Sequence, residues 1–253
     1  MKTEKRHEKV YLYGKHALKE ALLNAPKTVR KAFISPDVRD AELSSLLQTH
    51  AIPVAPLTRG KGRDMTGTDA HQGIIATVDT RTLLVPLDAF LKTLDTAKNP
   101  AVVVLGEVQD PHNVGAIIRS AAAFGLAGVL IPERNQAPVT GTVIKVSAGM
   151  AFRIPLVSIG NVNHALRVLK ERGFWTYGLA MNGHTPLQDE PFDAPSAFVI
   201  GNEGSGIREK TLETCDITLS IPIHPRAESL NASVSAAITF YAWSAKHAEA
   251  LAS

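Results

Sequence analysis

The 253-residue sequence predicts an α/β protein with a small N-terminal α/β domain and a larger domain built on a parallel sheet. From Ala101 onward, apolar runs alternate with helical segments, a pattern typical of parallel strands covered on both faces. Before residue 80, shorter strand and helix patterns form a segment of normal domain size. We therefore expect an N-terminal domain over residues 1–80, a linker over 81–99 and a C-terminal domain over 100–253.

The N-terminal domain is expected to contain two helices and two strands. A helix is predicted over residues 15–23, followed by a strand over 30–34. Asp40 precedes a second helix over 41–51 and is suited to cap it, and a strand over 73–78 closes the domain. The buried stripe of the first helix is expected to consist of Ala17, Leu18, Ala21 and Leu22.

Six apolar segments of the C-terminal domain are predicted as buried strands. They cover residues 101–108, 128–133, 153–159, 174–181, 196–201 and 216–223. Helical patterns lie between them, over residues 113–124, 161–173 and 207–215, and a long final helix is expected from about Asn231 to Ala250. A single cysteine, Cys215, excludes an intrachain disulfide and suits a reducing compartment.

The positive charge is concentrated in the first third of the chain. Residues 1–79 carry a net charge of +4 and residues 80–253 a net charge of −1. Part of the excess lies in Arg59, Lys61 and Arg63, which are suited to bind RNA phosphates or, alternatively, form a solvated polar turn. Neither a secretory signal nor an apolar stretch long enough to span a bilayer is present, which predicts a cytoplasmic protein without membrane association.

The first polar segment follows the strand over 101–108 and has the sequence EVQDPHNVG, residues 107–115. Ligands bind at the carboxyl ends of strands in open α/β sheets, so this position favours a site. Asn113 is suited either to cap the next helix or to contact a ligand. Arg119 lies about two turns into that helix among alanines and isoleucines, which favours a specific partner over a surface salt bridge.

Two more polar segments follow later strands. FVIGNEGSGI, residues 198–207, has three glycines around Glu203 and matches neither the phosphate-binding loop nor the dinucleotide fingerprint. IPIHPRAESLNASVS, residues 221–235, places Ser229 and Asn231 where the final helix should begin, so both are candidates for capping or for the site. Each segment is a weak signal alone, but the ordered set on one sheet is strong.

In this order the three segments closely resemble the motifs of the SpoU/TrmH family of RNA ribose 2′-O-methyltransferases. The resemblance covers about residues 100–250, and YLYGKHALKEAL and AHQGIIA are similar to the small substrate-binding domain of many members. That domain is similar in fold to certain RNA-binding ribosomal proteins. The resemblance therefore implies a catalytic domain whose C-terminal segment forms a trefoil knot, although ordinary topology rules disfavour knots.

The resemblance also implies a cofactor, a partner and site residues. S-adenosylmethionine would lie in the knot against Leu179, Ala180, Gly201, Ile221 and Leu230. The chain would act as a homodimer, with the active site near an interface to which the final helix contributes Val234, Ala237, Ile238 and Tyr241. The catalytic residues would be Arg119, Asn113, Glu203, Ser229 and Asn231, with Glu203 orienting Asn113 or Arg119.

Arg119 would lie beside the target hydroxyl. A free guanidinium has a pKa above about 12, so a deprotonated arginine base is costly at neutral pH. We therefore expect Arg119 to hold the adjacent phosphate and the hydroxyl, while that phosphate assists proton loss. No metal-ligand spacing occurs near His112 or His224, so no metal is expected.

The attached N-terminal domain favours a guanosine of 23S ribosomal RNA as the target. A tRNA guanosine 2′-O-methyltransferase is the alternative within the same class. A non-catalytic RNA-binding or ribosome assembly factor of the same fold is an alternative outside it, and an oxidoreductase is disfavoured because the dinucleotide glycine pattern is missing.

Overall fold

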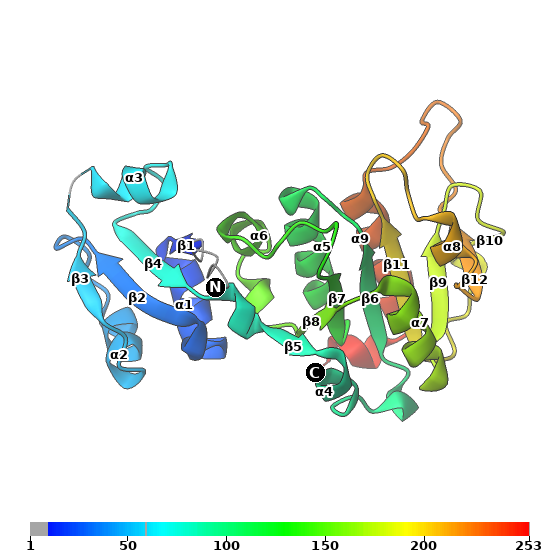
Figure 1. The fold of residues 1–253 in the computed structure, drawn as a ribbon, viewed down its shortest axis with the longest axis horizontal. Coiled ribbons are helices and arrows are strands. Elements are labelled where there is room, and N and C mark those ends of the chain that lie inside the picture. Colours follow the sequence, from blue (N-terminus) through cyan, green and yellow to red (C-terminus); the bar gives the residue numbers. More distant parts are fainter. Residues whose placement is uncertain (1–9, 59, 253) are drawn as a thin grey trace, which may run out of the picture. The chain divides into compact units, whose positions relative to one another are not determined.

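The computed structural model describes residues 10–58 and 60–252, and the chain divides into two compact units between Leu83 and Leu84 (Figure 1). The N-terminal unit has a four-stranded sheet of order β1-β4-β2-β3. Only β2 and β3 are parallel. Its elements are β1 (Val10–Tyr13), α1 (Lys15–Asn24), η1 (Pro26–Thr28), β2 (Val29–Ile34), α2 (Ala41–Thr49), β3 (Val54–Pro56), α3 (Lys61–Thr66), β4 (Ile74–Val78) and η2 (Thr80–Leu83).

The core of the N-terminal unit lies between its sheet and helices α1 and α2. Leu12, Ala32 and Ala76 form one row across β1, β2 and β4, and all three are buried. The expected stripe of α1 is confirmed at Leu18, Ala21 and Leu22, which are fully buried. Asp40 caps α2 as predicted, because its side chain accepts a hydrogen bond from the Leu43 amide at 2.9 Å.

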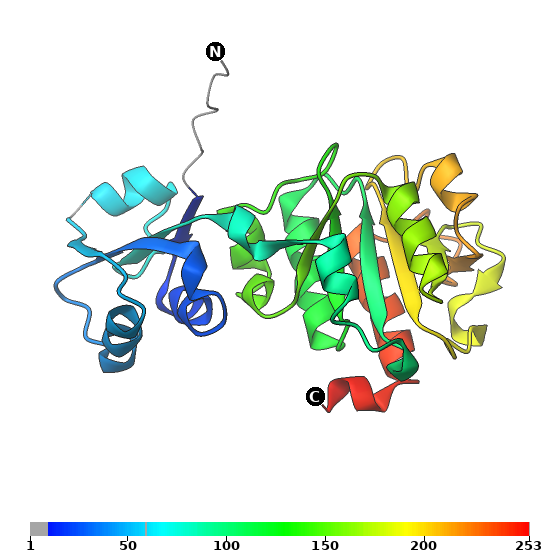
Figure 2. The ribbon, with the colours of Figure 1, turned by 60° about the horizontal axis from the view of Figure 1, so that its bottom comes forward.

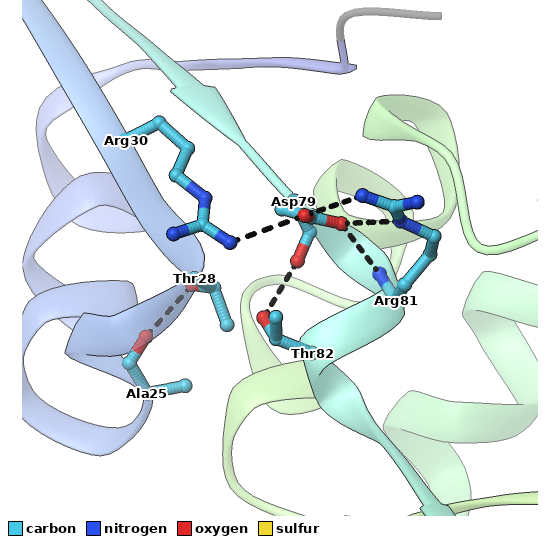
Figure 3. Close-up of polar contacts among 6 residues, drawn as sticks. All are labelled: Ala25, Thr28, Arg30, Asp79, Arg81 and Thr82. Carbon is cyan, nitrogen blue, oxygen red and sulfur yellow. Dashed lines mark hydrogen bonds and ion pairs between the residues drawn. The ribbon is translucent and has the colours of Figure 1, made fainter. Parts of the chain in front are cut away.

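An ionic cluster around Asp79 fixes the end of β4 (Figure 3). The carboxylate accepts hydrogen bonds from the Arg81 side chain at 2.9 and 2.8 Å and from Arg30 at 3.2 Å. The Thr82 hydroxyl donates to the Asp79 carbonyl at 2.7 Å. The hydrogen bonds from Arg81 and Arg30 outweigh the effect of burial and hold the pKa of Asp79 well below its usual range.

The C-terminal unit contains an eight-stranded sheet of order β10-β12-β9-β11-β6-β7-β8-β5, in which every neighbouring pair is parallel. The parallel α/β prediction is therefore confirmed. The strands are β5 (Leu84–Pro86), β6 (Ala101–Gly106), β7 (Gly128–Pro132), β8 (Leu156–Ile159), β9 (Trp175–Leu179), β10 (Thr185–Pro186), β11 (Ser196–Gly201) and β12 (Ile217–Ser220).

Helices cover both faces of this sheet (Figures 1 and 2). Helices α4 and α7 share a core cluster with Val102, Val104 and Val157, while α5, α6 and α9 pack together elsewhere. The helices are α4 (Leu87–Leu91), η3 (Thr96–Lys98), α5 (Pro111–Ala123), α6 (Gly141–Val146), η4 (Met150–Phe152), α7 (Val162–Glu171), η5 (Leu187–Asp189), α8 (Glu209–Leu212), α9 (Ala232–Ser244) and η6 (Ala248–Leu251).

The segment expected as a linker, residues 81–99, differs from that expectation. Its apolar residues join the C-terminal unit: β5 pairs with β8, and Phe90 and Leu91 of α4 are buried in the core cluster. Phe90 packs so closely that a Cβ added at Gly128 would lie 2.6 Å from its ring. These elements are three and five residues long, too short to show a clear period in the sequence.

The final helix is shorter than predicted, since α9 ends at Ser244 rather than near Ala250. The His247 ring stacks on Trp243 with 4.7 Å between ring centroids, and its Nδ1 lies 2.9 Å from the Trp243 carbonyl oxygen. In a continuing helix that carbonyl would accept from the His247 amide, which instead bonds to Ser244 at 3.0 Å. The histidine side chain thus competes with the helix for one acceptor.

Candidate active site

The first polar segment forms the start of α5 at the carboxyl end of β6. Asp110 caps the helix by accepting from the His112 amide at 2.8 Å, and Pro111 occupies the first helical position, where no backbone donor is needed. Gly115 allows α5 to approach α6, because a Cβ there would lie 2.7 Å from the Cβ of Val146. Asn113 is therefore inside the helix, not at its cap, and is 6% exposed.

A chain of hydrogen bonds joins all three polar segments. The Glu203 carboxylate accepts from the backbone amides of Gln109 at 3.2 Å and Asp110 at 3.1 Å, and from the Asn113 side-chain amide at 3.0 Å. The Asn113 carbonyl oxygen in turn accepts from the Asn231 amide at 3.0 Å. Three of the five expected catalytic residues are thus brought together, from sequence positions up to 118 residues apart.

The groups at the two ends of this hydrogen-bond chain decide which side chain donates and which accepts. Burial alone would raise the pKa of Glu203, but the hydrogen bonds from Asn113 and from the backbone outweigh it and hold that pKa below its usual value. Glu203 is therefore an acceptor only, so Asn113 must turn its NH₂ group toward it. At the other end, Asn231 caps α9 by accepting from the Ser233 amide at 2.8 Å, which leaves its NH₂ group for Asn113.

A cavity of about 620 Å³ opens at the carboxyl ends of β9, β11 and β12. All five residues expected to hold the cofactor line it, as do Glu203 and Ser229. Its walls combine apolar side chains with the backbone of the strand ends and of the glycine loop. The cofactor candidates on this wall are Leu179, Ala180, Gly201, Ile221 and Leu230.

At Gly201, two backbone segments of the cavity wall approach each other closely. A Cβ at this position would lie 2.4 Å from the carbonyl carbon of Gly206 and the amide nitrogen of Ile207, both backbone atoms of the same loop. The loop folds back on itself there through a bridge between Asn202 and Gly206. The first glycine of the second segment is therefore required for this close approach of backbone to backbone.

The expected site residues outside this network and the cavity are Arg119 of the C-terminal unit and the basic residues of the N-terminal unit. Arg119 is exposed on α5, and within residues 10–58 and 60–252 it has no hydrogen-bond or ion-pair partner. In the N-terminal unit, Lys61 and Arg63 are exposed on α3, where Arg63 pairs with Asp69 at 3.5 Å. Arg59 lies outside the described residues.

Asn202 is a site residue that the sequence interpretation missed. Its side-chain oxygen accepts from the amides of Gly204 at 2.9 Å and Ser205 at 3.1 Å, and its NH₂ group donates to the Glu107 carbonyl at 3.0 Å. An asparagine two residues before a glycine is a turn signal, so the first contact was accessible from the sequence. The second joins residues 95 positions apart and was not.

Burial raises the pKa of the Cys215 thiol to about 12, which suits an unreactive structural cysteine. Among the described residues, no group of three or more His, Cys, Asp or Glu side chains is placed to hold a metal ion. No helix formed by those residues has the length and apolar character needed to cross a bilayer.

Comparisons with known proteins match both units. Residues 100–241 match the SpoU rRNA Methylase family, and residues 11–83 match the family described as RNA 2′-O ribose methyltransferase substrate binding. In structure, the chain is similar to the SpoU methyltransferase AviRb from Streptomyces viridochromogenes, with a TM-score of 0.80 at 22% identity. That likeness covers 95% of this chain and 90% of AviRb.

Curated relatives are named as RNA methyltransferases. The 23S rRNA (guanosine-2′-O-)-methyltransferase RlmB of Ralstonia nicotianae is 33% identical over 91% of this chain and 93% of its own length. An uncharacterized tRNA/rRNA methyltransferase of Synechocystis is 36% identical over 91% of this chain, which spans only 61% of that relative. The resemblance inferred from the three polar segments is thereby confirmed: the chain belongs to the SpoU rRNA methylase family.

Proposed function

We propose that this protein transfers a methyl group from S-adenosylmethionine to the ribose 2′-hydroxyl of a guanosine in 23S ribosomal RNA. One observation carries the proposal: the cavity lined by all five cofactor candidates borders the hydrogen-bond chain of Glu203, Asn113 and Asn231. The relatives named as 23S rRNA guanosine methyltransferases support the choice of substrate.

The cavity suits S-adenosylmethionine in size and chemistry. Its volume of about 620 Å³ is within the range of pockets that enclose small cofactors. S-adenosylmethionine carries no phosphate, and neither Lys nor Arg is among the residues that line the cavity. The strand ends at Leu179 and Gly201 line the cavity, and we assign the edge of the adenine to backbone groups there and its faces to apolar side chains of the lining.

The bound cofactor supplies an activated methyl group, so the protein must position the ribose and assist loss of the hydroxyl proton. We assign the ribose contact to Arg119, whose exposed guanidinium can bind a phosphate and a hydroxyl at once. Asn113, fixed by Glu203 and Asn231, sets the shape of the loop that faces the ribose. Ser229, exposed at the rim of the cavity, is placed to hydrogen-bond the substrate.

We further infer a homodimer that pairs through α9, with a trefoil-knotted C-terminal segment around the cofactor, in the cytoplasm. Support for the dimer is the apolar stripe that α9 exposes, where Val234 is 46% and Tyr241 63% exposed. Monomeric proteins rarely leave such groups contiguous on one helix. Lys61 and Arg63 of the N-terminal unit are assigned to RNA phosphates, and that unit is expected to resemble RNA-binding ribosomal proteins.

The test is methyl transfer from labelled S-adenosylmethionine into total RNA of cells that lack this protein, followed by mapping of the modified nucleotide. We expect label at one ribose of 23S rRNA. Arg119→Lys should lower the rate at least about 100-fold while cofactor affinity is retained, because the planar two-pronged donor is lost. Label in tRNA would overturn the rRNA target. Absence of label in every RNA and of cofactor binding would favour a non-catalytic assembly factor.

A further inference from the structure

A second cavity, of about 570 Å³, lies at the carboxyl ends of β6, β7 and β8. It is distinct from the cofactor cavity, since Ile207 is the one residue common to both linings within the described chain. The loop over residues 201–208 runs along both cavities. Nothing in the proposed chemistry above uses this second cavity, which we call the β6–β8 cavity.

Glu107 lines one wall of the β6–β8 cavity and pairs there with Arg208. Its carboxylate accepts two hydrogen bonds from Arg208, at 2.9 Å from Nε and 2.7 Å from Nη2. The backbone of Glu107 has a φ of 69°, a left-handed conformation that residues other than glycine rarely adopt. The Asn202 side chain donates to the Glu107 carbonyl and helps to hold that conformation.

The rest of the lining offers the groups that recognise a nucleotide. Glu133 accepts a hydrogen bond from Ser158, and Asn163 bonds to Thr211 and to the Lys210 carbonyl. Their carboxylate and amide keep further hydrogen-bonding capacity, which can pair with base edges. Lys210 is exposed at the rim and is suited to a phosphate. Pro132 and Val162 supply apolar surface against which a base can lie. The mixed charge makes a lone anion or a purely apolar ligand a poor match.

Asn202 connects the two cavities. Its NH₂ group holds Glu107 in the β6–β8 cavity, while its oxygen holds the Gly204 and Ser205 amides of the loop that lines the cofactor cavity. Two neighbouring residues of the same loop therefore contact the opposite strand end, Asn202 at Glu107 and Glu203 at Asp110. A ligand in one cavity lies one loop away from a ligand in the other.

We propose that the β6–β8 cavity binds an unpaired nucleotide of the RNA that flanks the methylated one. The proposal rests on the function proposed above and adds a second contact point between substrate and catalytic unit. Proteins that read RNA by sequence splay single-stranded bases into such pockets. Occupancy would help fix the register of the RNA, so that one ribose out of many reaches the cofactor.

Gly160 provides a clean way to fill this cavity. It lines the cavity, its φ lies outside the left-handed region, and no atom lies within 4 Å of an added Cβ. Gly160→Leu should therefore add a bulky side chain to the lining of the cavity without a clash of its Cβ. Ala97→Leu is the matched control, because it places the same uncharged side chain at an exposed position of η3 that lines neither cavity.

The probe is the shortest transcript that the wild type methylates, made intact and with single abasic sites at each nucleotide flanking the modified one. Filter binding gives the Kd for RNA, and calorimetry gives the Kd for S-adenosylmethionine. We expect one abasic position to weaken wild-type binding about tenfold. Gly160→Leu should weaken binding of the intact RNA by a similar factor, and the two changes together should weaken it no further.

Cofactor affinity should stay within about twofold of wild type in both variants, because the cofactor occupies the other cavity. An unchanged RNA affinity of Gly160→Leu would overturn the proposal. It would also be overturned if, at every abasic position, the loss of affinity added to the loss caused by Gly160→Leu. Those outcomes leave the proposed methyl transfer standing. Failure of the wild type to methylate any RNA would instead refute the proposed function.

Discussion

Replacing Asn113 by Asp tests the hydrogen-bond chain most directly. The substitution keeps the size of the side chain but places a second carboxylate 3.0 Å from Glu203, where an amide donor now lies. Two unit charges at that distance repel by about 5.5 kcal/mol at an effective dielectric constant of about 20. Since Glu203 is open to solvent, we discount this to about 2–4 kcal/mol of lost stability at pH 7.5.

A fall in pH should remove stability that Glu203 contributes to the wild type, whereas it should reduce the charge repulsion in Asn113→Asp. In the wild type the pKa of Glu203 is lowered by folding, so its contribution is present above the unfolded pKa and is lost as the pH falls through the folded pKa. In Asn113→Asp the carboxylate pair takes up a proton more readily when folded, so its pKa is raised. The stability that comes from sharing a proton is then lost as the pH rises, and the deficit should shrink below about 1 kcal/mol near pH 4.5.

Urea denaturation followed by tryptophan fluorescence measures this difference. Both tryptophans, Trp175 and Trp243, belong to the C-terminal unit, so the signal reports the unit that contains the substitution. Gln188→Glu, which adds one charge at an exposed position of the same unit, is the control and should be near neutral. A deficit of equal size at both pH values would refute the reasoning, because it would mean that charge repulsion is not its cause.

Two further substitutions test the glycine loop and the ionic cluster. Gly201→Ala should weaken S-adenosylmethionine binding at least about tenfold, because its Cβ would lie 2.4 Å from backbone atoms. Gly204→Ala is the control: its Cβ would make only an ordinary contact at 3.6 Å, so the affinity should not change. Calorimetry measures both affinities. Asp79→Asn should destabilise the N-terminal unit by about 1 kcal/mol at neutral pH, seen as faster amide exchange in β4, because both arginines lose a charged partner and are largely exposed. That difference should fade as the pH falls through the lowered pKa of Asp79.

The sequence predicted the parallel sheet, and it also predicted a set of residues that line one cavity, for a physical reason. Buried parallel strands are read directly as apolar runs, and the residues that follow them must meet at one edge of the sheet. Leu179, Gly201 and Ile221 follow from that rule together with the family resemblance, and all three line one cavity. The missed elements were those without a period of their own, such as β5, and those decided by competition for one acceptor, such as the end of α9 at His247.

The β6–β8 cavity could not be predicted because its wall is built from contacts across the chain. The pairs Glu107 with Arg208 and Glu107 with Asn202 are separated by 101 and 95 residues. No local pattern marks Glu107 as left-handed, since that conformation is imposed by the partners that hold it. Only the fold shows that one strand end carries two polar residues with different neighbours: Glu107 lines the β6–β8 cavity, and the amide of Asp110 donates to Glu203.

Asn231 shows why capping and site formation are not competing roles at the start of α9. A cap needs only an acceptor, which Ser, Thr or Asp would supply as well as Asn. Asn231 uses its oxygen for that purpose, toward the amides of Ser233 and Val234. Its NH₂ group then donates to Asn113, a contact for which Asp has no donor and for which Ser or Thr offers only the one hydroxyl that also serves as the cap. Because Glu203 fixes that orientation of Asn113, the choice of asparagine at the cap follows from a carboxylate 28 residues earlier in the chain.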